Sequence, residues 1–256
     1  MTRKFLTKQQ IIQGLKQVQE MGWTKSLRPL NSGGIGNTID SLLGLPESNL
    51  PIADSAQWEL KSHRLGSSSL LTLFHREPEP KERKIVASIL LPGYGWPGRP
   101  GETSFRQTLR ATQATDRGFG IAVDHAGQRV VVYFDATRVH SRHSHWLASV
   151  NARAGLGPLS PQPYWPFQDL FLKASTKLLN SFYVEAEARR QNGEEFFRIR
   201  QVLILQNFEV DRFLLAIEHG EAAIDFDART RKNHGTKFRL RQDCIPDLYR
   251  YAEEIL

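Results

Sequence analysis

Three residues that could together hydrolyse a phosphodiester bond lie close to one another in this 256-residue chain. Glu59 and Lys61 are separated by one residue within residues 57–63, where apolar and polar side chains alternate, and Asp54 precedes them. Alternation with a period of two predicts a strand that presents Glu59 and Lys61 on one face. Two neighbouring carboxylates can hold a hard divalent cation, and an ammonium group beside that cation can orient a water for attack on phosphorus.

The same residues also have a structural explanation. A glutamate and a lysine two residues apart on a strand are common, and an exposed pair of this kind is usually solvated and contributes little stability. Short motifs also match by accident. The motif therefore needs support from the rest of the chain.

Three further stretches give that support. Residues 33–40 form a glycine-rich helix start, residues 69–75 form an apolar strand that ends in histidine, and residues 234–239 form a basic segment near the C-terminus. The spacing of Asp54, Glu59 and Lys61 resembles the active-site motif of the PD-(D/E)xK nucleases. With the other stretches, in this order, the chain resembles the MvaI/BcnI family of type II restriction endonucleases, which are MutH-like. The resemblance spans most of the chain and is weakest in the middle.

The resemblance implies a fold and an active site. The expected fold is α/β, the MutH-like PD-(D/E)xK fold, with a mixed, antiparallel-rich sheet flanked by helices and a DNA cleft between two lobes. Residues 1–134 are expected to form the catalytic lobe and residues 135–256 the recognition lobe, with one continuous unit as the alternative. Mg²⁺ is expected on Asp54 and Glu59, with Lys61 positioning the attacking water. Asp40 is a possible accessory acid, where relatives have glutamate; a solvated helix acid is the alternative.

The resemblance also implies residues that contact DNA. The major groove offers guanine O6 and N7 to arginine and cytosine N4 to a carboxylate. The candidates are His75, Asp225, His234, Lys237 and Arg239. Two positions depart from the relatives, because Asp227 stands where one has arginine and Lys237 where another has histidine. These departures leave the preference for the central base open.

The charge of the chain is consistent with a polyanionic partner. The formal net charge is +7, and residues 229–241 hold no acid but six basic residues: Arg229, Arg231, Lys232, Lys237, Arg239 and Arg241. A basic cluster of this kind favours the phosphate backbone of a nucleic acid. Contacts to phosphate supply affinity and salt dependence but little specificity. The expected partner is double-stranded DNA.

Local patterns predict the elements around these residues. Thr7 and Gln10 have the spacing of a capping box at the start of a helix. Strands are expected to form hairpins around residues 125–127 and 191–193. We further expect the strand at residues 57–63 to pair with residues 70–74, residues 91–101 to be irregular, and a helix to close the chain at residues 246–255.

Three histidines close in sequence, His140, His143 and His145, allow a second kind of site. Imidazoles can bind zinc, but this spacing fits neither a helical HExxH motif nor a zinc finger. A polar loop that contacts DNA is the favoured interpretation, and zinc is the alternative.

The remaining features place the protein in the cytoplasm. The one cysteine, Cys244, excludes an internal disulfide. The sequence lacks the apolar block of a signal peptide and any apolar run long enough for a bilayer. We therefore expect a monomeric, Mg²⁺-dependent restriction endonuclease with a cognate DNA methyltransferase in the same cell. It should cut a short G·C-rich target of the CCNGG type and leave 5′-phosphates. The alternatives are a MutH-like mismatch-repair nicking endonuclease and a non-catalytic DNA-binding module.

Overall fold

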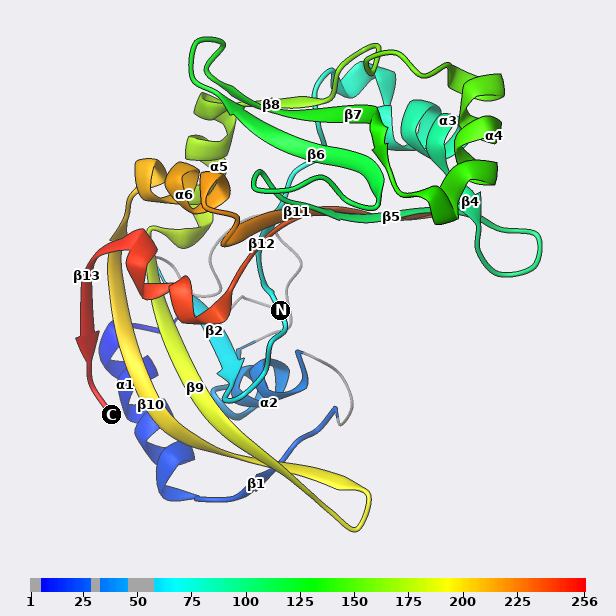
Figure 1. Cartoon of the computed structure of the whole chain (residues 1–256). Helices are drawn as coiled ribbons and strands as arrows, with labels where there is room; N and C mark the ends of the chain where they lie inside the picture. The colour runs from blue at the N-terminus through cyan, green and yellow to red at the C-terminus, as the bar shows by residue number, and fades with distance from the viewer. Residues whose placement is uncertain (1–5, 29–32, 46–57) are drawn as a thin grey trace. The chain divides into compact units, whose positions relative to one another are not determined.

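A computed structural model describes residues 6–28, 33–45 and 58–256 of the chain (Figure 1). The chain divides into two compact units, each built from separate segments. Unit 1 comprises Met1–Leu71, Lys173–Glu209 and Gln242–Leu256, and unit 2 comprises Thr72–Leu172 and Val210–Arg241. The chain therefore passes between the units several times, and residue 134 lies inside unit 2. The assignment of catalysis to residues 1–134 and recognition to residues 135–256 stays a prediction.

Unit 1 is built on a five-stranded sheet that packs against helices. Its strands run in the order β1-β10-β9-β2, and β13 also pairs with β10. The elements are α1 (Lys8–Glu20), β1 (Thr24–Lys25), α2 (Gly34–Leu42), β2 (Glu59–Arg64), β9 (Asn180–Gln191), β10 (Glu194–Phe208) and β13 (Tyr249–Glu254). The Thr7 hydroxyl and the Gln10 side chain cap the start of α1 reciprocally, which confirms the predicted capping box.

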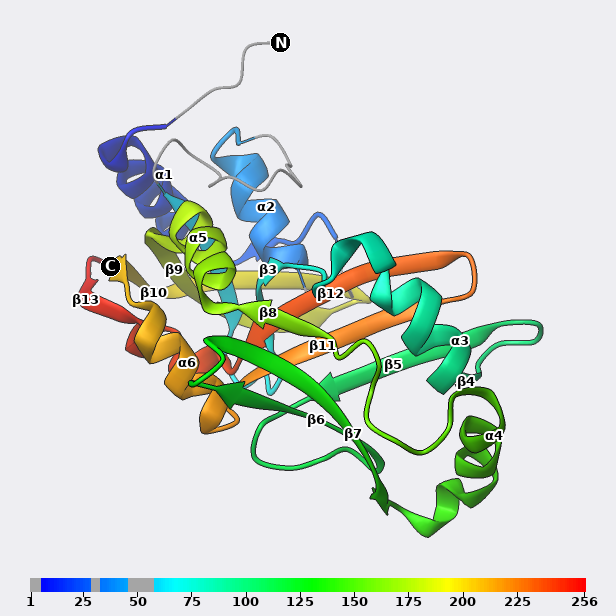
Figure 2. The ribbon, with the colours of Figure 1, turned by 90° about the horizontal axis from the view of Figure 1, so that it is seen from above.

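Apolar side chains of α1 and α2 form the core of unit 1 against the sheet. Ile11 and Leu15 of α1 and Ile39 of α2 are buried in one cluster with Trp58 and with residues of β9 and β10. Figures 1 and 2 show both helices beside these strands. Burying such side chains stabilises a fold by about 1.5–3 kcal/mol each. Helix α2 approaches β2 closely at Gly36, where a Cβ atom would lie 2.8 Å from Ser62 Oγ.

The β2 strand is confirmed, but its expected partner is wrong. β2 pairs in parallel with β9, with Glu59 opposite Ser181 and Lys61 opposite Tyr183. The following strand, β3 (Leu71–His75), instead pairs with β12 in another sheet. A parallel neighbour cannot follow through a tight turn, since parallel strands need a long crossover. The partner of β2 is therefore more than a hundred residues away, where local pattern does not reveal it.

Unit 2 contains two sheets. A five-stranded sheet has the order β3-β12-β11-β5-β4 and a three-stranded sheet the order β6-β7-β8. Its further strands are β4 (Trp96–Pro97), β5 (Thr103–Leu109), β6 (Arg117–Asp124), β7 (Arg129–Val139), β8 (Tyr164–Pro166), β11 (Ala222–Arg229) and β12 (Lys232–Leu240). Its helices are α3 (Leu91–Tyr94), α4 (Ser144–Ala154) and α6 (Val210–Glu218), while α5 (Phe167–Leu178) begins in unit 2 and ends in unit 1.

Aromatic rings fill the core of unit 2. Phe105 and Phe119 meet edge to face with their centroids 5.2 Å apart, and Phe105 meets Phe226 of β11 in the same way. Trp165 lies against Phe226 and Phe238, and its indole N–H donates to the Arg76 carbonyl at 3.0 Å. One face of β11 therefore packs on this core, which leaves the alternate residues of β11 on the other face.

Both predicted hairpins are confirmed. β6 and β7 pair in antiparallel fashion around the turn at residues 125–128, and β9 pairs with β10. At the second turn, Asn192 and Gly193 have φ of 53° and 79°. Two successive positive φ values characterise a type I′ turn, whose twist matches that of the strands.

Three local expectations are wrong in part or in whole. The chain ends in a 3₁₀ turn at Pro246–Leu248 and in strand β13, because residues 249–254 add to the edge of β10. Residues 91–101 include α3 and β4 and so are not wholly irregular. His143 lies in a short 3₁₀ helix (Ser141–His143) and His145 in α4 rather than in a loop, while His140 caps the start of the 3₁₀ helix. None of the helices in the described ranges is long and apolar enough to cross a membrane.

Gly118 is expected to be a stability-determining position of unit 2. Its φ is +74°, and an added Cβ would lie 2.3 Å from the Asp135 carbonyl oxygen, a backbone atom. Gly118→Ala should cost about 1–2 kcal/mol for the left-handed conformation and about 1–3 kcal/mol more for the clash. Gly101→Ala is the matched control, since Gly101 has φ of +75° and nothing within 4 Å. Urea unfolding measures both variants, and an equal loss in the two would contradict the steric argument.

Candidate functional site

Strand β2 places Glu59 and Lys61 side by side, as the alternation predicts. The Lys61 Nζ atom lies 2.5 Å from Glu59 Oε1. Glu59 is only 2% exposed and Lys61 14% exposed, so this face of the strand is covered rather than solvated. Burying a carboxylate is unfavourable unless a cation and hydrogen bonds compensate it. This burial argues against the interpretation of the pair as a solvated surface contact.

A second lysine lies at the same carboxylate. Lys177, near the end of α5, places its Nζ atom 3.4 Å from Glu59 Oε1 and is 18% exposed. The sequence analysis missed this residue. Its position carried a signal, because Leu170, Ala174 and Lys177 have the i, i+4, i+7 spacing of one helix face. Leu170 and Ala174 are fully buried, so the pattern places a lysine on the buried face of α5.

The second oxygen of Glu59 has the character of a metal ligand. Glu59 Oε2 is buried and has no hydrogen-bond partner among the described residues. A buried carboxylate oxygen without a hydrogen bond is costly, and a hard divalent cation takes such oxygens as ligands. The described residues contain no group of three or more His, Cys, Asp and Glu side chains that could hold a metal ion. Asp54, the other expected ligand, lies outside the described residues.

The possible accessory acid, Asp40, lies on α2. It is half-buried and follows Gly36, the residue where α2 approaches β2, by one helical turn. The structure thus places Asp40 on the helix that packs against the strand of Glu59. A catalytic role for Asp40 stays a prediction.

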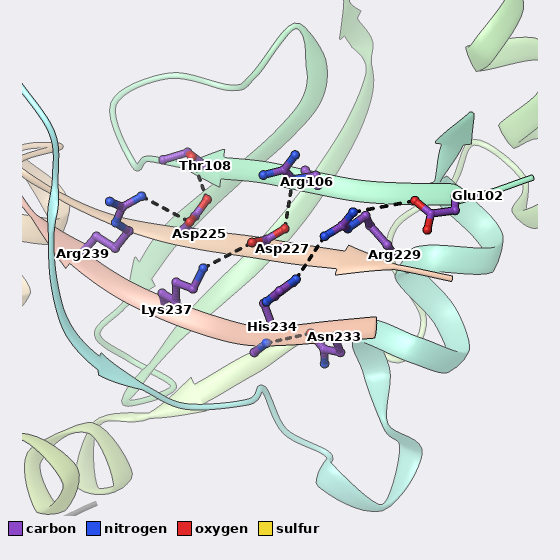
Figure 3. Close-up of polar contacts among 11 residues, drawn as sticks. Glu102, Arg106, Thr108, Asp225, Asp227, Arg229, Asn233, His234, Lys237 and Arg239 are labelled. Atoms are coloured by element: carbon purple, nitrogen blue, oxygen red, sulfur yellow. Dashed lines mark hydrogen bonds and ion pairs between the residues drawn. The ribbon is translucent and has the colours of Figure 1, made fainter. Parts of the chain in front are cut away.

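The outward-facing residues of β11 and its two neighbouring strands form a polar surface, here called the β11 face. Its members are Arg106, Thr108, Asp225, Asp227, Arg229, His234, Lys237 and Arg239 (Figure 3). The Thr108 hydroxyl donates to Asp225 Oδ1 at 2.9 Å, and Arg239 Nη1 donates to Asp225 Oδ2 at 3.4 Å. Of the predicted DNA-contacting residues, the structure therefore brings Asp225, His234, Lys237 and Arg239 together.

Asp227 has two basic neighbours on this face. Arg106 Nε lies 3.0 Å from Asp227 Oδ1, and Lys237 Nζ lies 3.4 Å from Asp227 Oδ2. Burial alone would raise the pKa of Asp227, but the charges of Arg106 and Lys237 outweigh it and hold the pKa below its usual value. Asp227 is therefore an ionised acceptor at neutral pH. Beside it, Arg229 Nη2 lies 3.3 Å from His234 Nε2.

His75 lies at the edge of the same unit. It is exposed at the end of β3, and its Cδ2 atom lies 3.3 Å from where a Cβ atom on Gly235 would be. The ring is therefore beside the residue that follows His234. The sequence analysis predicted His75 and did not single out Arg106 or Thr108. Their signal was the polar alternation of Ser104, Arg106 and Thr108 along one strand.

Two of the three clustered histidines, His140 and His143, have protein partners. His143 Nε2 lies 2.8 Å from Asp116 Oδ2, and His140 Nδ1 accepts from the Arg142 N–H at 3.2 Å. His145 is exposed on α4. The contacts from His143 and Arg142 lower the pKa of Asp116 to about 2 despite its partial burial. This arrangement stabilises the start of α4.

Comparisons with known proteins agree with the expected family. The sequence matches the MvaI/BcnI restriction endonuclease family over residues 12–249. A search of curated proteins finds no match. Among solved structures, the restriction endonuclease MvaI in complex with its cognate DNA substrate is similar with a TM-score of 0.79 and 21% identity, covering 98% of this chain and 100% of that one. MvaI without DNA is similar with a TM-score of 0.56 and 22% identity, covering 99% of this chain and 100% of the other.

These similarities confirm the expected fold, which is the mixed α/β fold of a PD-(D/E)xK-type restriction endonuclease. The family match covers most of the chain and includes β2, the β11 face and the helices that pack beside them. The protein belongs to the MvaI/BcnI restriction endonuclease family and is a type II site-specific deoxyribonuclease.

Proposed function

We propose that this restriction endonuclease hydrolyses double-stranded DNA with Mg²⁺ held by Glu59 and Asp54, and that Lys61 positions the attacking water. The observation that carries the proposal is the buried Glu59 carboxylate, with one oxygen held by lysine and the other without a hydrogen-bond partner in the described residues. A surface ion pair would not need this burial. The burial is instead consistent with a carboxylate that holds a metal ion.

The reaction would proceed by addition of a water oxygen to phosphorus and cleavage of the P–O3′ bond. The attacking water loses a proton to solvent, and the leaving O3′ atom gains one from water, so the products are a 5′-phosphate and a 3′-hydroxyl. Bound Mg²⁺ would lower the pKa of the water and offset the charge that develops on the phosphate. Lys61 would hold the attacking water by a hydrogen bond and add positive charge beside it. Glu59 keeps the Lys61 ammonium group in place.

Sequence recognition is assigned to the β11 face. Asp225 offers a carboxylate to cytosine N4, and Arg239 offers N–H donors to guanine O6 and N7. His234, Lys237 and His75 lie around them and would complete the contacts to the target. This chemistry supports a G·C-rich site, and the family resemblance supports a short target of the CCNGG type. The similar MvaI complex contains a cognate DNA substrate, which supports DNA as the ligand here.

We further propose that the enzyme acts as a monomer and is accompanied in the cell by a methyltransferase that protects the same site. Both follow from the family rather than from the geometry of the chain. The basic residues of the β11–β12 hairpin would bind the phosphate backbone. Arg231 and Lys232, both exposed at its turn, are suited to this role.

Substitutions in β2 test the catalytic assignment. Glu59→Ala and Lys61→Ala should each lower the rate of cleavage on the order of 10²–10³-fold or more, because the first removes a proposed ligand of Mg²⁺ and the second removes positive charge beside the attacking water. Phage DNA incubated with Mg²⁺ should give discrete fragments with the unsubstituted enzyme, and sequencing of their ends reads out the target and the 5′-phosphate. Wild-type rates in either variant would contradict the assignment. Single-strand nicks alone would favour the mismatch-repair type of enzyme.

Metal binding can be measured without cleavage. Mg²⁺ or Ca²⁺ at ten times its dissociation constant should stabilise the folded protein by about 1.4 kcal/mol. Glu59→Gln should abolish this gain in thermal unfolding, with and without a DNA duplex. Glu187→Gln is the control, since Glu187 is a partly exposed acid of unit 1 paired with Arg198. An unchanged gain in Glu59→Gln would remove Glu59 from the metal site.

A further inference from the structure

The Glu59 carboxylate contacts a second lysine, Lys177, in addition to Lys61. The ammonium groups of Lys177 and Lys61 both contact Oε1 of Glu59, at 3.4 and 2.5 Å. In the described part of the chain, Lys177 makes no other ion pair. All three side chains are largely shielded from water, with exposures of 18%, 14% and 2%.

Two ammonium groups exceed what one carboxylate needs. Glu59 and Lys61 neutralise each other, so within the described residues Lys177 adds one uncompensated positive charge. Removing an ammonium group from water without an anion is unfavourable. Such a cation is stabilised when an anion arrives, and the anion that the proposed reaction brings to Glu59 is a phosphodiester.

We propose that Lys177 binds the scissile phosphodiester, and that its ammonium moves from Glu59 Oε1 to a non-bridging phosphate oxygen when DNA is bound. This inference rests on the proposed function of Glu59 and Lys61. Lys177 would neutralise the phosphate in the ground state and the additional charge that develops during attack of water. Lys61 stays on Glu59 and serves the attacking water. The two lysines thus have different tasks at one carboxylate.

The test compares DNA binding in EDTA, where no cleavage occurs, with cleavage in Mg²⁺. A lysine that contacts phosphate contributes about 0.9 to the slope of log K against log salt. Lys177→Met should lower that slope by about 0.9 and weaken binding in EDTA, and it should lower the single-turnover cleavage rate on the order of 10²-fold. Lys177→Arg should restore the salt slope. Lys16→Met, an exposed lysine on α1 of the same unit, is the control and should change neither quantity.

The outcomes separate the inference from the function on which it rests. An unchanged salt slope in Lys177→Met, with slower cleavage, would overturn the phosphate contact and leave Lys177 as a residue that positions Glu59. Lys177→Gln replaces the methionine variant if thermal unfolding shows that the latter does not fold. Absence of cleavage by the unsubstituted enzyme would defeat the proposed function, while the salt slope in EDTA would still report on Lys177.

A second, independent observation concerns Asp227 and Arg106 on the β11 face. Asp225 and Asp227 are two residues apart on β11 and point to the same side, about 6.6 Å apart along the strand (Figure 3). Each aspartate forms an ion pair with an arginine: Asp225 with Arg239, and Asp227 with Arg106. A hollow of about 430 Å³ lies at Asp225, Asp227, Arg106 and Thr108.

A carboxylate and a guanidinium side by side match the major-groove edge of one C·G pair. The carboxylate accepts from cytosine N4, while the guanidinium donates to guanine O6 and N7. The Arg106 side chain is 61% exposed, and its Nε atom lies 3.0 Å from Asp227 Oδ1, so its terminal nitrogens are not needed for this ion pair. Asp227 is ionised and therefore an acceptor only. We infer that Asp227 and Arg106 together read one C·G base pair of the target, separately from Asp225 and Arg239.

A binding selection tests this assignment, which also rests on DNA recognition by the β11 face. The protein in EDTA is incubated with a pool of duplexes randomised around the cleavage site, and bound sequences are counted. Asp227→Asn and Arg106→Lys should relax the preference at the same single base pair by roughly 10–100-fold, which corresponds to about 1–3 kcal/mol. Asp135→Asn and Arg138→Lys are the matched controls, because Arg138 Nε lies 3.2 Å from Asp135 Oδ2 in an exposed pair of the same unit.

The pattern of the selection decides between a base contact and other roles. Relaxation at one base pair in both variants, with unchanged controls, is the expected result. A uniform loss of affinity at every position would assign Arg106 to the phosphate backbone and overturn the inference. No selection by the unsubstituted protein would instead remove sequence recognition itself. Cleavage activity is not needed for any of these outcomes.

Discussion

The burial of one carboxylate, Glu59, is the constraint on which the proposed active site depends. A carboxylate removed from water must be compensated, and here Lys61 and Lys177 compensate one of its oxygens. The other oxygen is buried and has no hydrogen-bond partner in the described residues. An electrostatic imbalance of this kind is unfavourable in a protein without ligands. In the proposed function, it would be relieved when a cation and a phosphodiester occupy the site together.

The sheet of unit 1 creates this constraint. β2 joins β9 in parallel, which covers the strand on one side with Trp58 and its core and places Glu59 beside Ser181. The end of α5 then brings Lys177 from a segment more than a hundred residues away. The site therefore consists of one local motif and one distant residue. A loss of the β2–β9 pairing would separate them even though the motif itself remained intact.

On the β11 face, the acids are balanced by neighbouring cations rather than buried as Glu59 is. Cross-strand neighbours from β5, β11 and β12 combine carboxylates with cations, so that each acid is paired with a cation without being deeply buried. The opposite face of the same strands packs on aromatic rings, including Phe226 and Phe238. The packed aromatic face and the ion pairs on the polar face together hold the hydrogen-bond donors and acceptors of the β11 face in fixed directions. Such preorganisation is what discrimination between base edges requires.

The sequence was sufficient for those features that depend on neighbours along the chain. The Thr7 cap, the turn at Asn192 and Gly193, and the alternation that places Glu59 beside Lys61 are all local, and the structure confirms them. The resemblance carried by four ordered motifs identified the family, and the comparisons confirm that family and its fold. The residues Asp225, His234, Lys237 and Arg239 were also named from the sequence, and they lie on one face.

Features that depend on long-range contacts could be decided only by the tertiary structure. The partner of β2, the pairing of residues 249–254 with the edge of β10 and the interleaving of the two units all join segments far apart in sequence. The roles proposed for Lys177 and Arg106 have the same origin, since each depends on an ion pair with an acid on another element. Local periodicity reports which face of an element is apolar, but it carries no information on which distant side chain will meet that face.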